Sequence, residues 1–285
     1  MKAKLDRRLN AYRPDLAHEA LRGQVQAERF VTPSPAHIRT PVADMMCQPN
    51  GEAGMDTQAL LGEAVHLLER TEDWCWVQRV RDDYVGYVQS DAVADGHVKP
   101  THLVSAPRTF TYAMDDLKAP RRRALSMGSL VTVVEKSERR GTIYALLDGG
   151  EAMIADHIIP IHEPLSDPVS IAEKLIHTPY LWGGATGFGI DCSGLVALAH
   201  LLCGRSVPRD SDMQADGLGE ALDSEKPELQ RGDLVFWKGH VGMMQSPTQL
   251  LHANGHTMDV TCEPFAQAVE RIGYLYGPPT GYRRP

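Results

Sequence analysis

Apolar residues recur at helical spacing in one stretch of the C-terminal half. Leu195, Leu198 and Leu202 lie three and four positions apart, and Gly204 follows the last of them. This periodicity predicts a helix that begins near Cys192 and ends before Gly204.

A second, shorter helix is predicted upstream of the first. Asp167 can cap it, Pro168 suits its first position, and Ile171 and Leu175 give it an apolar face. The helix must end before Pro179, because a residue that precedes a proline disfavours helical geometry.

Three short apolar runs further along the chain are typical of antiparallel strands. The runs are 234–237, 240–244 and 250–253. If the turn between the last two strands is centred on Ser246, His240 and His252 stand directly opposite each other. Their Cβ atoms then lie roughly 5 Å apart.

Short alternating runs also fill much of the N-terminal half, which favours small β-barrels. The first set is clear and contains a central Trp, whereas the second set is weaker and lacks one. The first set comprises 57–69, 74–80, 83–88 and 90–93, and the second comprises 125–134 and 143–150. Residues 16–29, after Pro14, are expected to form a short helix packed against the barrels, or else a partly disordered arm.

The candidate chemistry centres on Cys192, which stands at the predicted helix start between Asp191 and Ser193. Unpaired backbone N–H groups and the positive end of the helix dipole favour the nucleophilic thiolate there. A cysteine in a helical apolar pattern is often a packing residue, but the polar and small residues around this one do not resemble a core. His240 and His252 each have an ordinary structural interpretation when taken singly. Together with the thiol they supply a base and a group that orients it, which indicates a cysteine peptidase.

Several blocks of residues 180–255 support this interpretation, and in them the chain resembles the NlpC-type cysteine peptidases of bacterial cell-wall metabolism. These enzymes have a compact papain-like fold, and the blocks occur in the family's order and at close to its spacing. The blocks are Pro179-Tyr180-Leu181-Trp182-Gly183-Gly184, Asp191-Cys192-Ser193-Gly194, Pro208-Arg209-Asp210-Ser211, Arg231-Gly232-Asp233-Leu234-Val235-Phe236, Gly239-His240-Val241-Gly242 and Leu251-His252-Ala253. The family cleaves the amide bond that follows a γ-linked D-glutamate in peptidoglycan stem peptides, typically before a diamino acid.

The resemblance implies a role for each catalytic candidate. Cys192 is the nucleophile, His240 the base and His252 the residue that orients His240. The hydroxyl of Tyr180 assists at the oxyanion together with the backbone N–H of Cys192; the alternative is that Tyr180 is a core aromatic residue that fixes its loop.

The resemblance also implies substrate-binding residues in the same domain. Asp191, Ser193 and Ser211 match family positions that bind the substrate's amino terminus or its D-glutamate. Serine and aspartate near a helix start are also common helix caps, so the two interpretations stay open.

The two sets of strands resemble bacterial SH3-like domains, and this domain order resembles that of peptidases that recycle murein peptides. Those enzymes act on free stem peptides with an exposed L-Ala amino terminus, and a carboxylate and a Tyr of their first SH3-like domain bind its ammonium. By this resemblance Glu63 is the carboxylate, and Tyr84 or Tyr87 is the aromatic partner, since a buried ammonium needs a compensating charge. The alternatives are a solvated surface residue for Glu63 and barrel core for the tyrosines.

The expected fold class is α+β, with a C-terminal papain-like NlpC-type catalytic domain preceded by two small SH3-like β-barrels. The expected segments are an N-terminal arm or helix at 1–35, SH3-like domains at 36–97 and 98–163, and the peptidase domain at 164–285.

Length, charge and cysteine content narrow the functional classes. The chain has 285 residues, enough for two or three domains, and its net charge of -8 disfavours binding to nucleic acid or an anionic membrane. Five cysteines without framework spacing, and no recognisable secretory signal, indicate the cytoplasm. No apolar run is long enough to span a membrane.

The 12 histidines show no metal-ligand spacing. We therefore expect no metal or other cofactor, no nucleic-acid, membrane or obligate protein partner, and a murein-derived peptide as substrate.

The expected function is a cysteine endopeptidase that hydrolyses the γ-D-glutamyl-L-diamino acid bond of murein stem peptides with a free N-terminal L-Ala. The diamino acid is diaminopimelate or Lys, and the setting is cell-wall peptide recycling. The alternatives are a peptidoglycan amidase or acyltransferase of the same fold, or a wall-peptide-binding protein.

Overall fold

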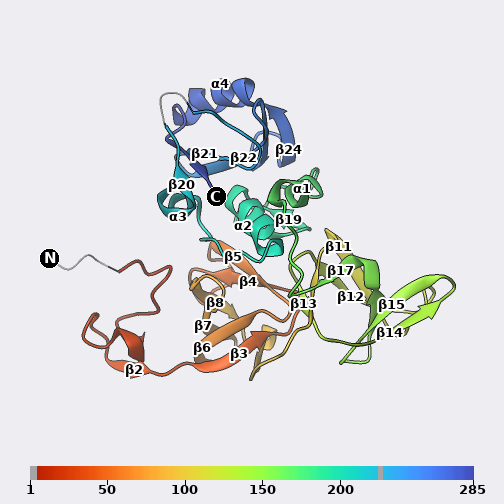
Figure 1. Ribbon diagram of the computed structural model, residues 1–285. Helices are drawn as coiled ribbons and strands as arrows, with labels where there is room; N and C mark the ends of the chain where they lie inside the picture. Colours follow the sequence, from red (N-terminus) through yellow and green to blue (C-terminus); the bar gives the residue numbers. More distant parts are fainter. Residues whose placement is uncertain (1–4, 224–226) are drawn as a thin grey trace. The chain divides into compact units, whose positions relative to one another are not determined.

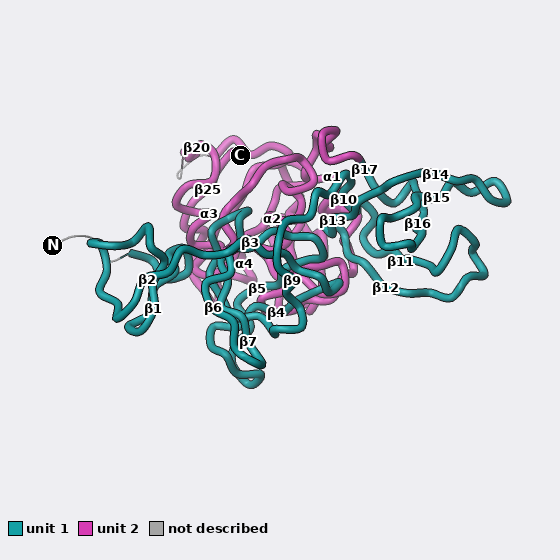
Figure 2. Tube along the Cα trace, turned by 90° about the horizontal axis from the view of Figure 1, so that it is seen from below, with its two compact units in different colours: residues 1–159 teal, residues 160–285 magenta. Residues whose placement is uncertain are grey.

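The computed structural model describes residues 5–223 and 227–285. The chain divides into two compact units, Met1–Ile159 and Pro160–Pro285, which Figure 2 distinguishes by colour. The first unit is built from strands and short 3-10 turns, and the second from a sheet with α-helices. Among the described residues, no helix is long and apolar enough to cross a bilayer.

The first barrel is a seven-stranded antiparallel sheet with the strand order β5-β4-β8-β7-β6-β3-β9 (Figure 1). Its elements are β3 (Ser34–Ile38), β4 (Val42–Met46), β5 (Met55–Leu60), β6 (Ala64–Arg70), β7 (Trp74–Arg79), β8 (Val85–Gln89), the 3-10 turn η2 (Ser90–Ala92) and β9 (Val93–Asp95). Alternate residues point to one face of a strand, which places Val65 and Leu67 of β6 and Cys75 and Val77 of β7 in the core. Trp76, on the opposite face of β7, packs outside this core.

The N-terminal segment covers that outer face, and the helix expected over 16–29 is wrong. The strand β1 (Leu16–His18) pairs in parallel with β2 (Arg29–Val31), and only the single 3-10 turn η1 (Glu19–Leu21) lies between them. One non-local and one local contribution explain the extended conformation: Leu16 is buried against Trp76, and Gly23 interrupts the connection with φ of 78°. Residues 1–4 of the expected N-terminal arm lie outside the described residues.

The second barrel repeats the succession of a strand hairpin, a short strand, a 3-10 turn and a final strand. Its strands form a five-stranded sheet, β12-β11-β16-β15-β14, and a three-stranded sheet, β13-β10-β17. The elements are β10 (His102–Val104), β11 (Arg108–Tyr112), β12 (Arg121–Ser126), β13 (Leu130–Val131), β14 (Val133–Arg139), β15 (Thr142–Leu147), β16 (Ala152–Ile154), η3 (Ala155–His157) and β17 (Ile158–Pro160). Leu61, in the turn after β5, packs into the core of this barrel and so ties it to the first.

The second unit is organised around a six-stranded sheet with the order β20-β25-β21-β22-β23-β24. The strands are β20 (Glu220–Ala221), β21 (Leu234–Trp237), β22 (His240–Ser246), β23 (Gln249–Asn254), β24 (Asp259–Pro264) and β25 (Gly281–Arg284). The helices are α1 (Pro168–Glu173), α2 (Cys192–Leu202), α3 (Ser211–Gly217) and α4 (Phe265–Tyr276), and a two-stranded ribbon joins β18 (Ala185–Thr186) to β19 (Gly189–Ile190). Figure 1 shows α4 on one side of the sheet and α1 and α2 on the other.

Alternation along the strands explains this layering. Met244 and Leu250 lie on one face and pack against Ala268 and Ile272 of α4. The neighbouring residues in sequence point to the opposite face of the sheet, where they are buried. This face is covered by α1 and α2, and α2 contacts β22 and β23. Both faces of the sheet are therefore covered, which fixes the register of the strands that carry the two histidines.

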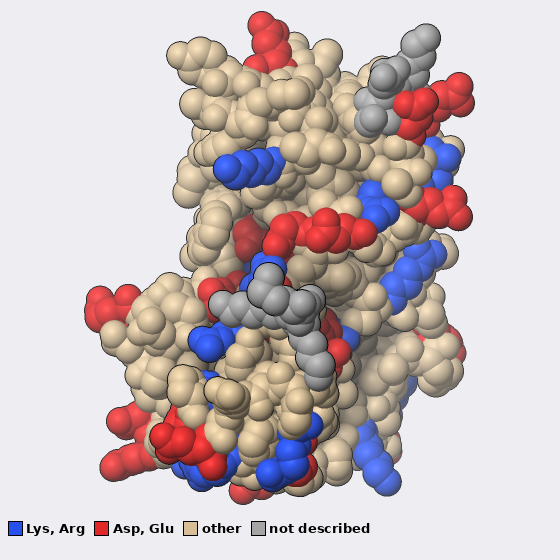
Figure 3. Space-filling model, turned by 90° about the vertical axis from the view of Figure 1, so that its left-hand side faces the viewer, with Lys and Arg blue, Asp and Glu red and all other residues tan. Residues whose placement is uncertain are grey.

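The predicted local elements of this unit are confirmed. Asp167 caps α1 by accepting the Val169 N–H at 2.9 Å, and α2 begins at Cys192 and ends before Gly204, which has φ of 70°. The three predicted strands are β21, β22 and β23. Figure 3 shows acidic and basic side chains interspersed on one face of the molecule, consistent with a modest net negative charge.

The predicted alignment of the two histidines needs one correction. The turn lies at Pro247 and Thr248, because Ser246 pairs with Gln249, and a bulge precedes it. Continuing this register from the pair Met243–Leu251 sets His252 opposite Gly242, so the two histidines are diagonal rather than direct neighbours. Diagonal positions are about 7–8 Å apart at Cα, which aromatic side chains can span.

Candidate active site

Asp191 caps α2 and fixes the loop that precedes the nucleophile. Its Oδ1 accepts the Gly194 N–H at 2.7 Å, and its Oδ2 accepts the Gly183 N–H at 2.9 Å. A Cβ at Gly194 would lie 2.3 Å from the carbonyl oxygen of Gly184, so only glycine fits there. The sequence Asp-Cys-Ser-Gly thus sets Cys192 at the first position of α2, with the loop held against it.

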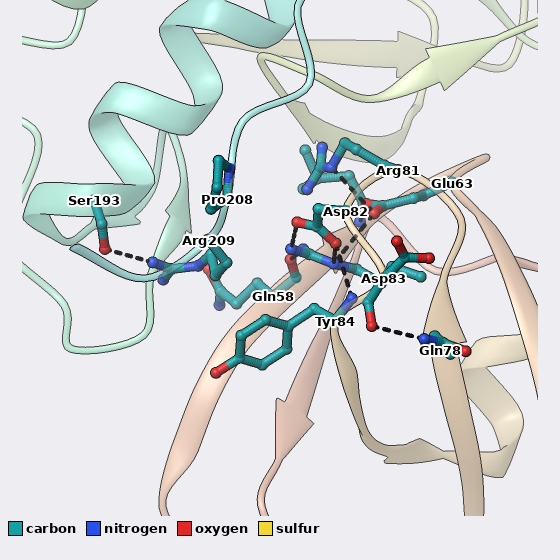
Figure 4. Close-up of polar contacts among 12 residues, drawn as sticks. Gln58, Glu63, Gln78, Arg81, Asp82, Asp83, Tyr84, Ser193, Pro208 and Arg209 are labelled. Atoms are coloured by element: carbon teal, nitrogen blue, oxygen red, sulfur yellow. Dashed lines mark hydrogen bonds and ion pairs between the residues drawn. The ribbon is translucent and has the colours of Figure 1, made fainter. Parts of the chain in front are cut away.

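A buried arginine completes this arrangement. Arg209 donates to both carboxylate oxygens of Asp191, at 3.0 and 2.7 Å, and to the Ser193 hydroxyl at 2.9 Å; Figure 4 shows the bond to Ser193. The polar atoms of Asp191 and Ser193 are therefore occupied by protein groups. The cap interpretation of Asp191 is confirmed, and Ser193 lies beside it without capping the helix.

The Cys192 thiol is buried, with 7% of the residue exposed. Burial raises the pKa of Cys192 to about 12, and the negative charge of Asp191 adds to this. Hydrogen bonds from the backbone N–H groups of Val241 and Ser193, and the charge of Arg209, act in the opposite direction but are smaller than the burial. Desolvation by burial therefore opposes the thiolate that the helix start favours. Its bond to Val241 brings the sulfur to the residue next to His240.

The two histidines form a hydrogen-bonded pair. His240 Nε2 and His252 Nδ1 are 2.9 Å apart, and the rings meet edge to face with their centroids 5.1 Å apart. His252 is fully buried. The ring centroid of Trp237 lies 5.8 Å from that of His240. Burial lowers the pKa of His240 to about 3, and the adjacent His252 adds to this. Burial thus favours the neutral imidazole of His240, the form that accepts a proton.

Two further residues, which the sequence interpretation missed, extend this pair. Glu263 Oε1 lies 2.8 Å from His252 Nε2, and Arg271 Nη2 donates to the same oxygen. Leu250 pairs with Glu263 and His252 pairs with Thr261, so Glu263 is the diagonal neighbour of His252 on the same face. The Asn-Gly turn at 254–255 signalled this hairpin, but Arg271 comes from α4, whose packing no local pattern reveals.

Tyr180 and Ser211 are the two other candidates of this unit. Burial raises the pKa of Tyr180 above its ordinary value, and the neighbouring Cys192 adds to this, so the phenol stays protonated. Tyr180 is only half-buried, and its backbone N–H donates to the carbonyl of Met258 at 2.8 Å. Ser211 is the first residue of α3, and Asp210, not Ser211, stands at the N-cap position. The cap interpretation of Ser211 is therefore wrong.

Glu63 lies in a buried cluster of charges in the first barrel (Figure 4). Its Oε2 accepts the Leu60 N–H at 3.1 Å. Its Oε1 accepts no hydrogen bond within the described chain and lies 3.6 Å from Arg79 and 3.4 Å from Arg81. The interpretation of Glu63 as a solvated surface residue is wrong.

The two tyrosines expected beside Glu63 have different surroundings. The ring of Tyr84 is buried, and the guanidinium of Arg79 lies 5.7 Å from its centroid, which links Tyr84 to the Glu63 cluster. Tyr87 packs against Trp76 and accepts a hydrogen bond from Arg13 at 3.1 Å. Tyr87 therefore belongs to the contact with the N-terminal segment.

No group of three or more His, Cys, Asp or Glu side chains suited to a metal ion occurs in 5–223 and 227–285. The chemistry that the second unit offers is that of a thiol, an imidazole pair and the carboxylate beyond them.

Two family models match this chain. The model of the NlpC/P60 family matches residues 177–271, and the model described as the bacterial dipeptidyl-peptidase Sh3 domain matches residues 45–93. The first match contains the thiol and both histidines, and the second contains Glu63 and both tyrosines. The expected fold class, an SH3-type region before a papain-like NlpC-type domain, is confirmed.

Relatives of known sequence match most of the chain. A protein of Bacillus subtilis named gamma-D-glutamyl-L-lysine dipeptidyl-peptidase is 30% identical over 227 residues, which are 70% of this chain and 72% of the relative. A protein of Lysinibacillus sphaericus named dipeptidyl-peptidase 6 is 29% identical over 233 residues, covering 75% of this chain and 85% of that one.

One solved structure supports the fold over both units. A crystal structure of an NlpC/P60 family protein from Bacillus cereus aligns with a TM-score of 0.72 at 23% identity and covers 88% of this chain and 99% of its own. Together with the sequence relatives, this shows that the chain belongs to the NlpC/P60 family and is a cell-wall cysteine peptidase.

Proposed function

We propose that the protein is a cytoplasmic endopeptidase that hydrolyses the γ-D-glutamyl-L-diamino acid bond of murein stem peptides with a free N-terminal L-Ala. In this proposal it releases L-Ala-γ-D-Glu during cell-wall peptide recycling. The names of the Bacillus subtilis relative and of a Bacillus cereus relative, 29% identical over 229 residues, support the bond. The match to the dipeptidyl-peptidase Sh3 model supports a substrate with a free amino terminus.

The observation that carries the proposal is the hydrogen-bonded pair of His240 and His252, together with a bond that ties the sulfur of Cys192 to the strand of His240. The sulfur accepts the N–H of Val241, the residue that follows His240. His240 Nε2 is engaged by His252, which leaves Nδ1 as the atom that exchanges a proton with the thiol.

The reaction begins from a neutral thiol and a neutral imidazole. As the sulfur of Cys192 attacks the γ-carbonyl carbon of D-glutamate, the thiol proton passes to His240 Nδ1. His240 then gives this proton to the amine of the leaving diamino acid, and a thioester remains on Cys192. Water, deprotonated by His240, hydrolyses the thioester and frees the dipeptide.

The oxyanion needs donors that do not ionise. The backbone N–H of Cys192 lies in the first turn of α2, where N–H groups have no partner within the helix. The raised pKa of Tyr180 keeps its hydroxyl protonated, so it donates a second hydrogen bond. No cofactor takes part in this scheme, and no other macromolecule is required.

Substrate recognition is assigned to both units in this proposal. Glu63 receives the ammonium of L-Ala, because one of its buried oxygens accepts no hydrogen bond from the described residues, and Tyr84 lines the same cluster. Ser211 binds the D-glutamate. Asp191 and Ser193 act by holding the loop of the nucleophile, since Arg209 and backbone groups occupy their polar atoms.

Mass spectrometry of the products of a defined tripeptide tests the proposal. L-Ala-γ-D-Glu-diaminopimelate and its L-Lys counterpart are each incubated with the protein and with Cys192→Ala. The expected result is release of L-Ala-γ-D-Glu by the wild type alone, and loss of cleavage when the tripeptide is N-acetylated.

Other outcomes identify the alternatives. Cleavage at another amide bond contradicts the proposed specificity and indicates an amidase. Formation of a hydroxamate in place of the free acid, with hydroxylamine present, indicates an acyltransferase. Binding of the tripeptide without turnover indicates a wall-peptide-binding protein.

A further inference from the structure

Four side chains form one line of hydrogen bonds that leads away from the nucleophile. His240 Nε2 lies 2.9 Å from His252 Nδ1, His252 Nε2 lies 2.8 Å from Glu263 Oε1, and Arg271 donates to that same oxygen. His252 is fully buried, whereas the side chains of Glu263 and Arg271 are 19% and 27% exposed. The line thus runs from the reacting imidazole to a carboxylate near the surface.

The protonation state of Glu263 determines which group donates in each hydrogen bond of this line. The hydrogen bond from His252, together with Arg271, lowers the pKa of Glu263, so its carboxylate is ionised and can only accept. His252 Nε2 must therefore carry a proton. A neutral His252 then has a lone pair on Nδ1, which accepts from His240 Nε2–H. The lone pair of a neutral His240 is left on Nδ1, the nitrogen that the reaction needs.

We propose that Glu263 and Arg271 are positioning residues of this peptidase: together they fix the tautomers of both histidines so that the free lone pair of His240 is on Nδ1. This inference rests on the proposed role of the two histidines, and the family match assigns no role to either residue.

Arg271 balances the charge of the carboxylate. The charged and titratable groups that act on His240 are His252 on β23, Glu263 on β24 and Arg271 on α4. Besides burial, His252 and Arg271 lower the pKa of His240 and Glu263 raises it. Removing Arg271 therefore favours the imidazolium of His240, whereas removing the charge of Glu263 disfavours it. A purely structural role predicts no such opposition.

The replacement Glu263→Gln allows donor and acceptor to exchange roles in each hydrogen bond of this line. A glutamine amide can donate to His252 Nε2, which then needs a lone pair there and a proton on Nδ1. His252 Nδ1–H would donate to His240 Nε2, and the proton of His240 would lie on Nδ1, where it blocks the base. Glutamine can also present its carbonyl oxygen, so we expect a mixture of tautomers and roughly a 10–100-fold fall in kcat with little change in KM.

The test reads the tautomers without any substrate. Long-range 1H–15N correlation spectra of histidine-labelled protein are recorded for the wild type, Glu263→Gln, Arg271→Gln and a control, Glu270→Gln. Glu270 is an exposed carboxylate on the same helix, next to Arg271. His240→Asn and His252→Asn spectra assign the resonances.

The expected spectra show Nε2–H tautomers of His240 and His252 in the wild type and in Glu270→Gln, and an admixture of Nδ1–H in Glu263→Gln. Unchanged tautomers in Glu263→Gln overturn the proposal, whatever substrate the enzyme prefers. Loss of peptide turnover in the wild type, with the expected tautomers present, instead contradicts the proposed function.

A second measurement remains informative if Glu263→Gln does not fold. The rate at which iodoacetamide alkylates Cys192 is followed against pH by peptide mapping, which separates it from the other four cysteines. The acid limb is expected to move to higher pH in Arg271→Gln and to lower pH in Glu263→Gln, with Glu263→Asp close to wild type. Shifts of equal sign in the first two variants, or none in Arg271→Gln, contradict the proposal.

Discussion

Two carboxylate–arginine pairs flank the candidate active site, and they differ in what the carboxylate binds. The side chains of Asp191 and Arg209 are 11% and 2% exposed. Besides Arg209, Asp191 binds backbone N–H groups of its own loop and helix. Glu263 and Arg271 are more exposed, and Glu263 binds the imidazole of His252. The first pair therefore builds the nucleophile loop, whereas the second sets where protons lie on the base.

The comparison shows that an ion pair near a catalytic centre has no fixed meaning. A buried pair whose oxygens are filled by backbone donors contributes to structure, and its loss leaves an uncompensated charge. A partly exposed pair has less effect on stability but can act through the one titratable group it contacts. Changes at the two arginines separate these two roles.

The largest expected effect is on stability, from Arg209→Met. This change leaves Asp191 buried without its guanidinium and is expected to lower the free energy of unfolding by about 3–5 kcal/mol. The equivalent change Arg271→Met is expected to cost about 1 kcal/mol or less. Thermal unfolding of both variants measures the difference; equal destabilisation would remove the distinction between the pairs.

A third carboxylate, Glu63 in the first barrel, extends the comparison to substrate binding. Glu63→Gln keeps the bond from the Leu60 N–H but removes the charge proposed to receive the substrate ammonium. We expect KM for the free tripeptide to rise roughly tenfold, the loss of one charge-assisted hydrogen bond. The N-acetylated peptide is the control, because its poor cleavage should not worsen. A similar loss on both peptides would assign Glu63 to the fold of the barrel.

The smallest expected effect concerns pH. A base whose pKa is lowered stays unprotonated in more acidic solution than an ordinary histidine, and the pKa of His240 is lowered from 6.5 to about 3. The acid limb of kcat/KM should therefore lie well below pH 6.5, with nearly constant rates from about pH 7 down to about pH 5. An acid limb near the ordinary value would show that the imidazole of His240 is solvated and contradict this prediction.

The sequence predicted what short stretches of chain determine. The cap at Asp191, the helix that starts at Cys192 and the strands that carry His240 and His252 all follow from local patterns, and the structure contains them. The contact between the two histidines was predicted from a wrong turn centre. The bulge before Ser246 moves the register, and the rings still reach each other because they are long enough to bridge a diagonal.

What the sequence could not predict depends on contacts distant in the chain. Burial raises the pKa of Cys192, and no pattern around the residue reports the depth of the sulfur. Arg209 and Arg271 reach their carboxylates from other elements. The strand pairing at Leu16 replaces an expected helix because its partner lies beyond the next turn and its packing surface is Trp76.

The central claim is that Cys192 is the acylated nucleophile, and trapping the intermediate tests it most directly. The protein is mixed with the tripeptide, quenched in acid within the first turnover and digested, and the peptide that carries Cys192 is weighed. The account predicts that this peptide gains the mass of an L-Ala-γ-D-glutamyl group through a thioester that neutral hydroxylamine removes. Turnover with that peptide unmodified, or with the acyl group on another residue, would contradict it.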